Sequence, residues 1–112
     1  MSRNIEIKTK GYYQSYVIKS NGEIELSFHI ESQELENIIP LLQTGLGIYL
    51  CMRVSRGKVE KEVGKYKIYQ FRTEETGETA LTFRSDIQQV NIENLVSLNT
   101  LKNTLTIELS EE

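Results

Sequence analysis

Apolar and polar residues alternate on both sides of an Asn-Gly dipeptide in the first third of the chain. After the dipeptide, the apolar residues recur with a period of two, as in a strand that buries one face: Ile24, Leu26, Phe28 and Ile30. Asn-Gly is preferred in two-residue type I′ turns, because both central residues of such a turn need a positive φ. The pattern therefore predicts a β-hairpin over residues 12–30, with Asn21 and Gly22 as its loop.

The two faces of this predicted hairpin differ in character. With a two-residue loop, Val17 faces Leu26 and His29 falls opposite Gln14. A slip of one residue would exchange the two faces, and this register is preferred because it gathers the large apolar side chains on one face. The other face is half aromatic and half polar, and we expect it to form a partner interface through these residues: Tyr12, Tyr16, Ile18 and His29.

The spacing of apolar residues becomes helical after the hairpin. Apolar residues fall at i, i+3, i+4 and i+7: Leu35, Ile38, Ile39 and Leu42. This spacing predicts a helix over residues 32–44, with Ser32 as its N-cap and Gly45 as its stop. Pro40 lies inside this range and lacks the N–H of a regular helix, so we expect a kink or an early end near Ile38.

Most of the remaining chain alternates as strands do. The ranges predicted to be strands are 4–10, 47–55, 58–72, 79–84 and 104–109. The first ends at Gly11, at a bend or a bulge. Gly64 predicts a bulge within the third, and Gly77 predicts a left-handed position in the charged loop before the fourth. Residues 85–102 fit a short helix as well as they fit a strand.

This order of elements predicts an α+β fold. We expect a mostly antiparallel β-sheet of six or seven strands, with one main helix near residues 32–44 packed on it. A half-closed barrel with the helix at one end is the alternative arrangement. The 112 residues are enough for one hydrophobic core and too few for two ordinary ones, so we expect residues 1–112 to form a single domain.

The composition of the chain favours a soluble protein over a membrane or secreted one. Hydrophobic residues make up 38% and charged residues 26% of the chain, a balance typical of globular proteins. No apolar run reaches the roughly 20 residues of a membrane span, and the first residues lack the apolar core of a secretory signal. With Cys51 as the single cysteine, we expect a soluble cytoplasmic protein. The richness in lysine, glutamate, isoleucine and asparagine suits an accessory protein of a bacterium or a phage.

Few residues could carry catalysis or bind a metal. His29 is the single histidine, so acid–base catalysis near neutral pH would have to begin there, and a partly covered strand histidine is the favoured interpretation. One histidine and one cysteine cannot complete a zinc site within one copy, and no glycine-rich phosphate loop is present. We therefore expect no enzymatic activity, no catalytic residue, no metal and no cofactor.

One segment mixes positive charge with aromatic residues. Residues 53–72 contain seven lysines and arginines against two glutamates, although the chain as a whole has a net charge of -3. Basic strands that also present flat rings bind single-stranded nucleic acid or nucleotide-like anions in many proteins. The candidate residues for such binding are Arg53, Arg56, Lys58, Lys61, Lys65, Tyr66, Lys67 and Tyr69. The competing interpretation is a solvated strand whose aromatic residues belong to the core.

The surplus of apolar and aromatic residues on both faces of several strands favours protein contacts. The leading hypothesis is a small non-catalytic protein-interaction domain, of the binding, accessory or inhibitor-like kind, that associates with itself or with another protein. The alternative is a binder of single-stranded nucleic acid or a nucleotide-like anion through residues 53–72. We expect no membrane partner.

Overall fold

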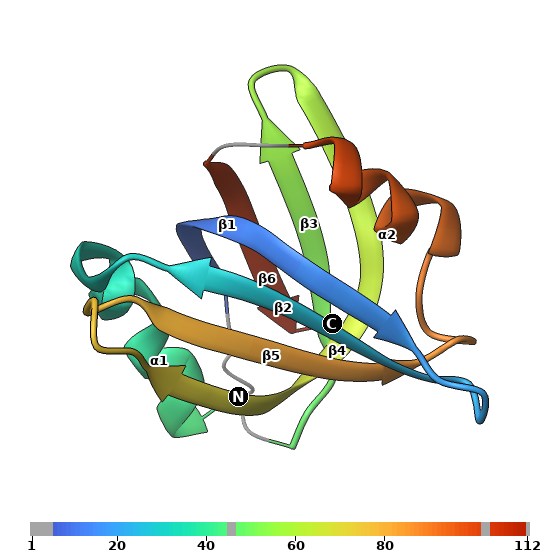
Figure 1. Cartoon of the computed structure of the whole chain (residues 1–112), viewed down its shortest axis with the longest axis horizontal. Helices are drawn as coiled ribbons and strands as arrows, with labels where there is room; N and C mark the ends of the chain where they lie inside the picture. Colours follow the sequence, from blue (N-terminus) through green and yellow to red (C-terminus); the bar gives the residue numbers. More distant parts are fainter. Residues whose placement is uncertain (1–5, 45–46, 102–103, 112) are drawn as a thin grey trace.

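Six strands pair edge to edge into one closed ring in the computed structural model, which describes residues 6–44, 47–101 and 104–111 (Figure 1). The strands are β1 (Glu6–Ile18), β2 (Glu23–Ile30), β3 (Leu50–Arg56), β4 (Val59–Thr73), β5 (Thr79–Asp86) and β6 (Leu105–Glu111). Around the ring they follow the order β1-β2-β5-β4-β3-β6, and every neighbouring pair is antiparallel. The predicted α+β class with a mostly antiparallel sheet is confirmed, and the ring is closed rather than half-closed.

The long strand β1 bends at Gly11. It pairs with β6 over residues 6–11 and with β2 over residues 12–18. A Cβ on Gly11 would lie 2.6 Å from Ile30 Cδ1 and 2.8 Å from the carbonyl oxygen of His29, so no side chain fits at the bend. The predicted strand end at this glycine is wrong, because β1 exchanges β6 for β2 as its partner there and continues.

The strand β4 changes partners in the same way, from β3 to β5. Gly64 has a φ of 122°, and a Cβ there would lie 2.5 Å from Val90 Cα. The chain that follows β5 fills this space, and Lys65 N donates to Gln89 O at 2.9 Å. The register of β3 with β4 shifts beside Gly64, which confirms the predicted bulge.

The β1–β2 hairpin forms as predicted, but its register differs by one residue. Leu26 pairs with Tyr16 and not with Val17. The loop has three residues, 20–22, and ends on Gly22 with a φ of 90°. A three-residue turn closed by a left-handed glycine accommodates Asn-Gly as well as a two-residue turn does. The predicted register is therefore wrong, because the dipeptide is compatible with both loop lengths.

Apolar side chains fill the interior of the ring. The four β2 residues predicted to form the core are completely buried: Ile24, Leu26, Phe28 and Ile30. Phe83 of β5 packs edge-to-face on Phe28 and on Tyr66, with ring centroids 6.2 and 6.4 Å apart. Buried residues from all six strands belong to this one cluster.

A 3₁₀ turn, η1 (Ser32–Glu34), leads into the helix α1 (Leu35–Thr44), which contacts β1. The predicted helix is confirmed, and of the two expected effects of Pro40, a kink or an early end near Ile38, the early end does not occur. The helix continues through Pro40, because Leu41 beyond the proline is completely buried against the barrel.

The cap of this helical segment also differs from the prediction. The N-cap position before η1 is held by Glu31 and not by Ser32, and its side chain makes no capping hydrogen bond. Within the predicted apolar stripe, Ile38 is completely buried and Ile39 is 46% exposed. Gly45, the predicted stop, lies outside the described residues.

The range that fitted a helix or a strand contains the helix α2 (Ile92–Ser97) and a 3₁₀ turn, η2 (Leu98–Thr100). Asn91 caps α2, since its Oδ1 accepts a hydrogen bond from Asn94 N at 3.1 Å. Leu95 is completely buried, and α2 contacts β4. In the described ranges, every helix is too short or too polar to span a membrane.

Candidate interaction surface

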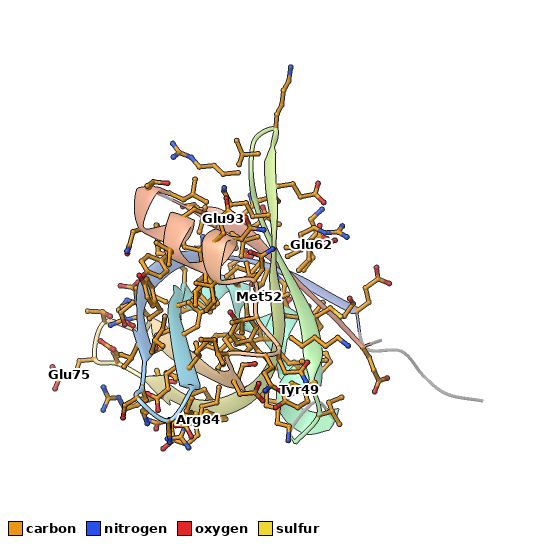
Figure 2. All side chains as sticks on the ribbon, turned by 90° about the vertical axis from the view of Figure 1, so that its right-hand side faces the viewer. Tyr49, Met52, Glu62, Glu75, Arg84 and Glu93 are labelled. Carbon is orange, nitrogen blue, oxygen red and sulfur yellow. The ribbon has the colours of Figure 1, made fainter. Side chains whose placement is uncertain are left out.

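The turn that joins β3 and β4 extends beyond the rest of the ring (Figures 1 and 2). Residues 56–61, which we name the basic arm, form its tip. β3 pairs with β6 only as far as Ser55, and β4 pairs with β5 only from Lys67 onward, so the arm is a two-stranded ribbon. Arg56 pairs with Val59, and Gly57 takes a φ of 61° in the turn. The arm therefore contributes little to the core and much to the surface.

The basic arm carries three cations: Arg56, Lys58 and Lys61. Arg56 and Lys58 are exposed, and Lys61 is half-buried. None of the three forms an ion pair with another described residue. Val59 stands between the two lysines and is 48% exposed. The arm thus offers positive charge and an apolar side chain in one place.

The position of Arg53 explains why these cations are unpaired. Its Nε lies 3.0 Å from a carboxylate oxygen of Glu60, and its two Nη atoms lie 3.5 Å from Glu62 and 3.6 Å from Glu108. The register of β3 with β4 places both neighbouring glutamates of the hairpin beside this one guanidinium. The acidic residue within the arm, Glu60, and the next one along β4, Glu62, are therefore paired with Arg53 and not with the arm cations.

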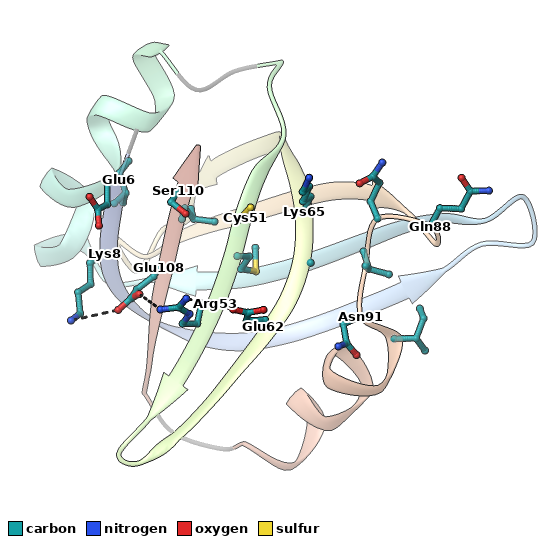
Figure 3. A pocket seen from close by; sticks show the side chains of 17 residues that line it. Glu6, Lys8, Cys51, Arg53, Glu62, Lys65, Gln88, Asn91, Glu108 and Ser110 are labelled. Atoms are coloured by element: carbon teal, nitrogen blue, oxygen red, sulfur yellow. Dashed lines mark hydrogen bonds and ion pairs between the residues drawn. The ribbon is translucent and has the colours of Figure 1, made fainter. Parts of the chain in front are cut away.

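A groove of about 1110 Å³ runs along the outer face of the strands, beside the base of the arm (Figure 3). Charged side chains of both signs line it, including Lys8, Arg53, Glu62 and Glu108, and Lys8 Nζ lies 3.6 Å from Glu108. The half-buried thiol of Cys51 faces the same space. Because these charges pair with one another, the groove wall has less capacity than the arm to attract a charged partner.

The structure does not bring the predicted basic and aromatic residues together on one surface. Tyr66 is completely buried, its hydroxyl donates to Val63 O at 3.3 Å, and burial raises the pKa of this hydroxyl well above its usual value. Tyr69 is half-exposed, but the guanidinium of Arg84 covers its ring at 3.3 Å. Tyr66 is therefore inaccessible for stacking on a base, and Arg84 covers the Tyr69 ring.

The other predicted basic residues are spread around the ring. Lys67 Nζ lies 4.7 Å from the ring centroid of Tyr49, and Lys65 is half-buried beside the bulge. Arg53 is surrounded by carboxylates, as described above. Of the eight predicted residues, the structure groups Arg56, Lys58 and Lys61 at one place, where the first two are exposed and the third is half-buried.

The predicted partner interface does not form one face either. Tyr12 and His29 pair with each other on the outer face of the ring, whereas Tyr16 packs against the core. Ile18 is 41% exposed beside the turn of the hairpin. The bulge after Tyr13 and the longer loop turn Tyr16 and Ile18 to the inner side, which corrects the prediction.

His29 lies between two carboxylates of the β4–β5 loop. Its Nε2 is 3.6 Å from Glu74 and its Nδ1 is 4.0 Å from Glu78, and Nε2 is buried without a hydrogen-bond partner. On the neighbouring strand, the hydroxyl of Tyr12 donates to Glu31. In the part of the chain that the structure describes, no set of three histidine, cysteine or acidic residues is arranged to hold a metal ion. These contacts tie the loop to the barrel.

Acidic residues gather at the end of the ring that α1 covers. The β4–β5 loop lies beside η1, since a Cβ on Gly77 would be 3.9 Å from Ser32 Cβ. The glutamates of this loop and of residues 31–36 are Glu31, Glu34, Glu36, Glu74, Glu75 and Glu78. No periodicity or motif predicted that residues 31–36 and 74–78 meet, because the contact is set by the closure of the ring.

The basic arm offers ionic and apolar contacts to a partner. Among the described residues, the two that could act in acid–base or nucleophilic catalysis, His29 and Cys51, lie apart from each other. The sequence signal for the arm is the Arg56-Gly57 turn with cations on both sides, but no pattern in the sequence indicates that this turn projects from the fold. Comparisons of this chain with protein-family models, with curated proteins and with solved structures find no match.

Proposed function

We propose that this chain is a small non-catalytic protein-interaction domain that binds an acidic protein surface through its basic arm. One observation carries the proposal: Arg56, Lys58 and Lys61 lie on a projecting ribbon without an ion-pair partner among the described residues, next to the exposed Val59. Cations that are solvated and unpaired retain their capacity to pair with a partner's carboxylates.

The charge of the rest of the molecule supports a protein partner over a polyanion. The net charge of -3 repels a long negative polymer, and affinity for nucleic acid depends strongly on neutralising its phosphates. A protein partner can offer carboxylates to the arm and other groups to the surrounding surface. Salt screens exposed charges beyond about 10 Å at moderate ionic strength, so a local contact of the arm is compatible with an acidic molecule.

The proposal of a non-catalytic role rests on the positions of the reactive side chains. His29 lies beside Glu74 and Glu78, and Cys51 is on a different face, below the arm. A nucleophile with a neighbouring general base is the usual requirement of covalent catalysis, and these two residues are not paired.

Binding of single-stranded nucleic acid or a nucleotide-like anion is the second candidate. The same three arm cations favour it, since lysine and arginine on a two-stranded ribbon can contact phosphates. The burial of Tyr66 weighs against it, because the predicted stacking platform is lost.

Titration of two labelled probes tests the proposal. One probe is a fluorescent hexaglutamate peptide and the other is a fluorescent oligothymidylate. The arm variant is Arg56→Gln with Lys58→Gln and Lys61→Gln. Its matched control, Lys8→Gln with Lys10→Gln and Lys67→Gln, removes the same charge from positions outside the arm.

We expect the unmodified chain to bind the peptide at low salt, the arm variant to bind at least about tenfold more weakly, and the control to bind as the unmodified chain does. Equal binding by the arm variant, or no peptide binding at all, would overturn the proposal. Tighter arm-dependent binding of the oligothymidylate would replace it with the second candidate.

A further inference from the structure

The basic arm and the exposed side of α1 lie at opposite ends of the ring (Figures 1 and 2). The residues on that side of the helix, which we name the α1 face, are Glu36, Asn37, Ile39 and Pro40, all of them exposed. The acidic β4–β5 loop lies beside the start of the helix. Because the body of the barrel separates the two surfaces, the arm cannot reach the α1 face of its own chain.

The two surfaces match in charge and in apolar character. On the arm, Val59 is 48% exposed and has Lys58 as its neighbour. On the α1 face, Ile39 is 46% exposed and lies one helical turn after Glu36. Each surface therefore presents one large apolar group beside charge, positive in one case and negative in the other.

From this complementarity we infer that the basic arm of one copy docks on the α1 face of a second copy. The inference rests on the proposed function of the arm and names its partner. Lys58 and Arg56 meet the carboxylate of Glu36 and the field of the neighbouring acidic β4–β5 loop, to which Glu75 belongs, while Val59 covers Ile39. An apolar contact at the centre with charges at its margin is the usual composition of a protein interface.

The placement of the two surfaces decides the form of the assembly. In a twofold dimer every contact occurs twice, so the arm and the α1 face of each copy would both have to touch the other copy in the same interface. Surfaces at opposite ends of a molecule cannot do this, so the contact is head-to-tail. Such contacts produce rings or chains that grow with concentration.

The contact is small and ionic, so it is weak and sensitive to salt. A two-stranded tip and one side of a short helix bury far less than the roughly 1,200 Å² of a stable interface. Two copies that each carry a net charge of -3 also repel one another at long range. We therefore expect association at high micromolar concentration in low salt and its loss at high salt.

Charge reversal tests the inference by sedimentation velocity of the full chain at roughly 50 and 500 mM NaCl. The arm-reversed variant is Arg56→Glu with Lys58→Glu, and the face-reversed variant is Glu36→Lys with Glu75→Lys. Matched controls reverse the same number of charges elsewhere: Lys8→Glu with Lys67→Glu, and Glu6→Lys with Glu93→Lys. All four reversed positions of the two test variants are exposed, so circular dichroism is expected to show an unchanged fold.

We expect each reversed variant alone to associate at least about tenfold more weakly than the unmodified chain, and the two controls to associate normally. An equimolar mixture of the two reversed variants, or one chain that carries all four changes, recovers association because the charges are again complementary. Recovery also shows that the reversed chains are folded.

Normal association of either reversed variant, or no recovery in the mixture, would overturn the inference. If the unmodified chain stays monomeric at low salt but binds hexaglutamate through the arm, the arm keeps its proposed function and the second copy is not its partner. If it does neither, the proposed function fails as well.

Discussion

The β1–β2 and β3–β4 hairpins use their charges in opposite ways. At the β1–β2 hairpin, Lys19 Nζ lies 2.8 Å from Glu23 and 3.0 Å from Glu25, and Arg84 of β5 lies 3.0 Å from Glu25. Each charge has a partner within the molecule. At the β3–β4 hairpin, Arg53 holds the nearby glutamates and the cations of the basic arm have no such partner in the described residues.

The backbone contacts of the two hairpins differ in the same sense. Ile87 N donates to Gly22 O at 2.9 Å, so the tip of the β1–β2 hairpin is bonded to the chain that follows β5. The nearest comparable contact of the arm is below its tip, where Asn94 Nδ2 donates to Glu62 O at 2.8 Å. The β1–β2 hairpin forms part of the barrel wall, and its charges pair within the molecule. The β3–β4 hairpin projects from the barrel and leaves the charges of its tip available to a partner.

The largest expected effect comes from the glycine at the base of the arm. Gly64→Ala combines a φ of 122° with a Cβ 2.5 Å from Val90 Cα, so we expect a loss of about 3–5 kcal/mol of unfolding free energy. Gly57→Ala at the tip has no atom within 4 Å of the new Cβ and is expected to cost about 1 kcal/mol. Urea unfolding measures both, and equal losses would contradict the contrast between base and tip.

The next prediction compares the loss of unfolding free energy when a paired cation of the β1–β2 hairpin region and an unpaired cation of the basic arm are removed. Arg84 contacts Glu25 and covers the ring of Tyr69, so Arg84→Ala is expected to lower the unfolding free energy by about 1–2 kcal/mol. Lys58→Ala, at the tip of the arm, is expected to change it by less than about 0.5 kcal/mol. Thermal and urea unfolding provide the comparison, and a larger loss for Lys58→Ala would show that the arm has an internal partner.

A smaller effect depends on pH. The Lys19 ammonium beside Glu25, together with Arg84, lowers the pKa of this carboxyl below its usual value. A carboxyl with a lowered pKa stabilises the fold above its unfolded pKa of about 4.3, and this contribution is lost as the pH falls through the folded value. The stability difference between the unmodified chain and Glu25→Gln is therefore expected to shrink from pH 7 to pH 3. Lys19→Gln removes the donor and is expected to weaken this pH dependence, whereas a difference that grows in acid would contradict the assignment.

At Tyr66 we expect a change in stability without a change in binding. Its hydroxyl is buried and bonded to Val63 O, so Tyr66→Phe is expected to cost about 1 kcal/mol of unfolding free energy and to leave the binding of both labelled probes unchanged. Weaker binding of the oligothymidylate by this variant would show that Tyr66 takes part in binding, contrary to its assignment to the core.

Local patterns predicted the elements of the fold well. The period-two burial of residues 24–30, the helix near residues 32–44 and the bulge at Gly64 all followed from periodicity and glycine. The closure of the ring did not, because the pairing of β1 with β6 joins opposite ends of the chain and leaves no local signal. The hairpin register failed because Asn21-Gly22 suits loops of two or three residues.

The candidate site was harder to predict than the fold. The bulge beside Gly64 resets the alternation of β4, so Val63 and Tyr66 are both buried although they are three residues apart, an odd spacing for one face of a regular strand. The pairing of Arg53 with Glu60 depends on the β3–β4 register, which the sequence alone did not supply. The sequence shows the positive charge of residues 53–72. Contacts between residues distant in the sequence determine which of these lysines and arginines have an ion-pair partner, and the sequence does not show those contacts.

Zero-length crosslinking is the most direct test of the central claim that the arm meets the α1 end of another copy. A carbodiimide joins a lysine to a carboxylate only when they touch, and a mixture of ¹⁴N- and ¹⁵N-labelled chains separates contacts between copies from those within one. The account predicts isotopically mixed peptides that join Lys58 or Lys61 to Glu36 or Glu75, and their loss at high salt. Mixed links that avoid the arm, or the absence of mixed links at high micromolar concentration in low salt, would contradict it.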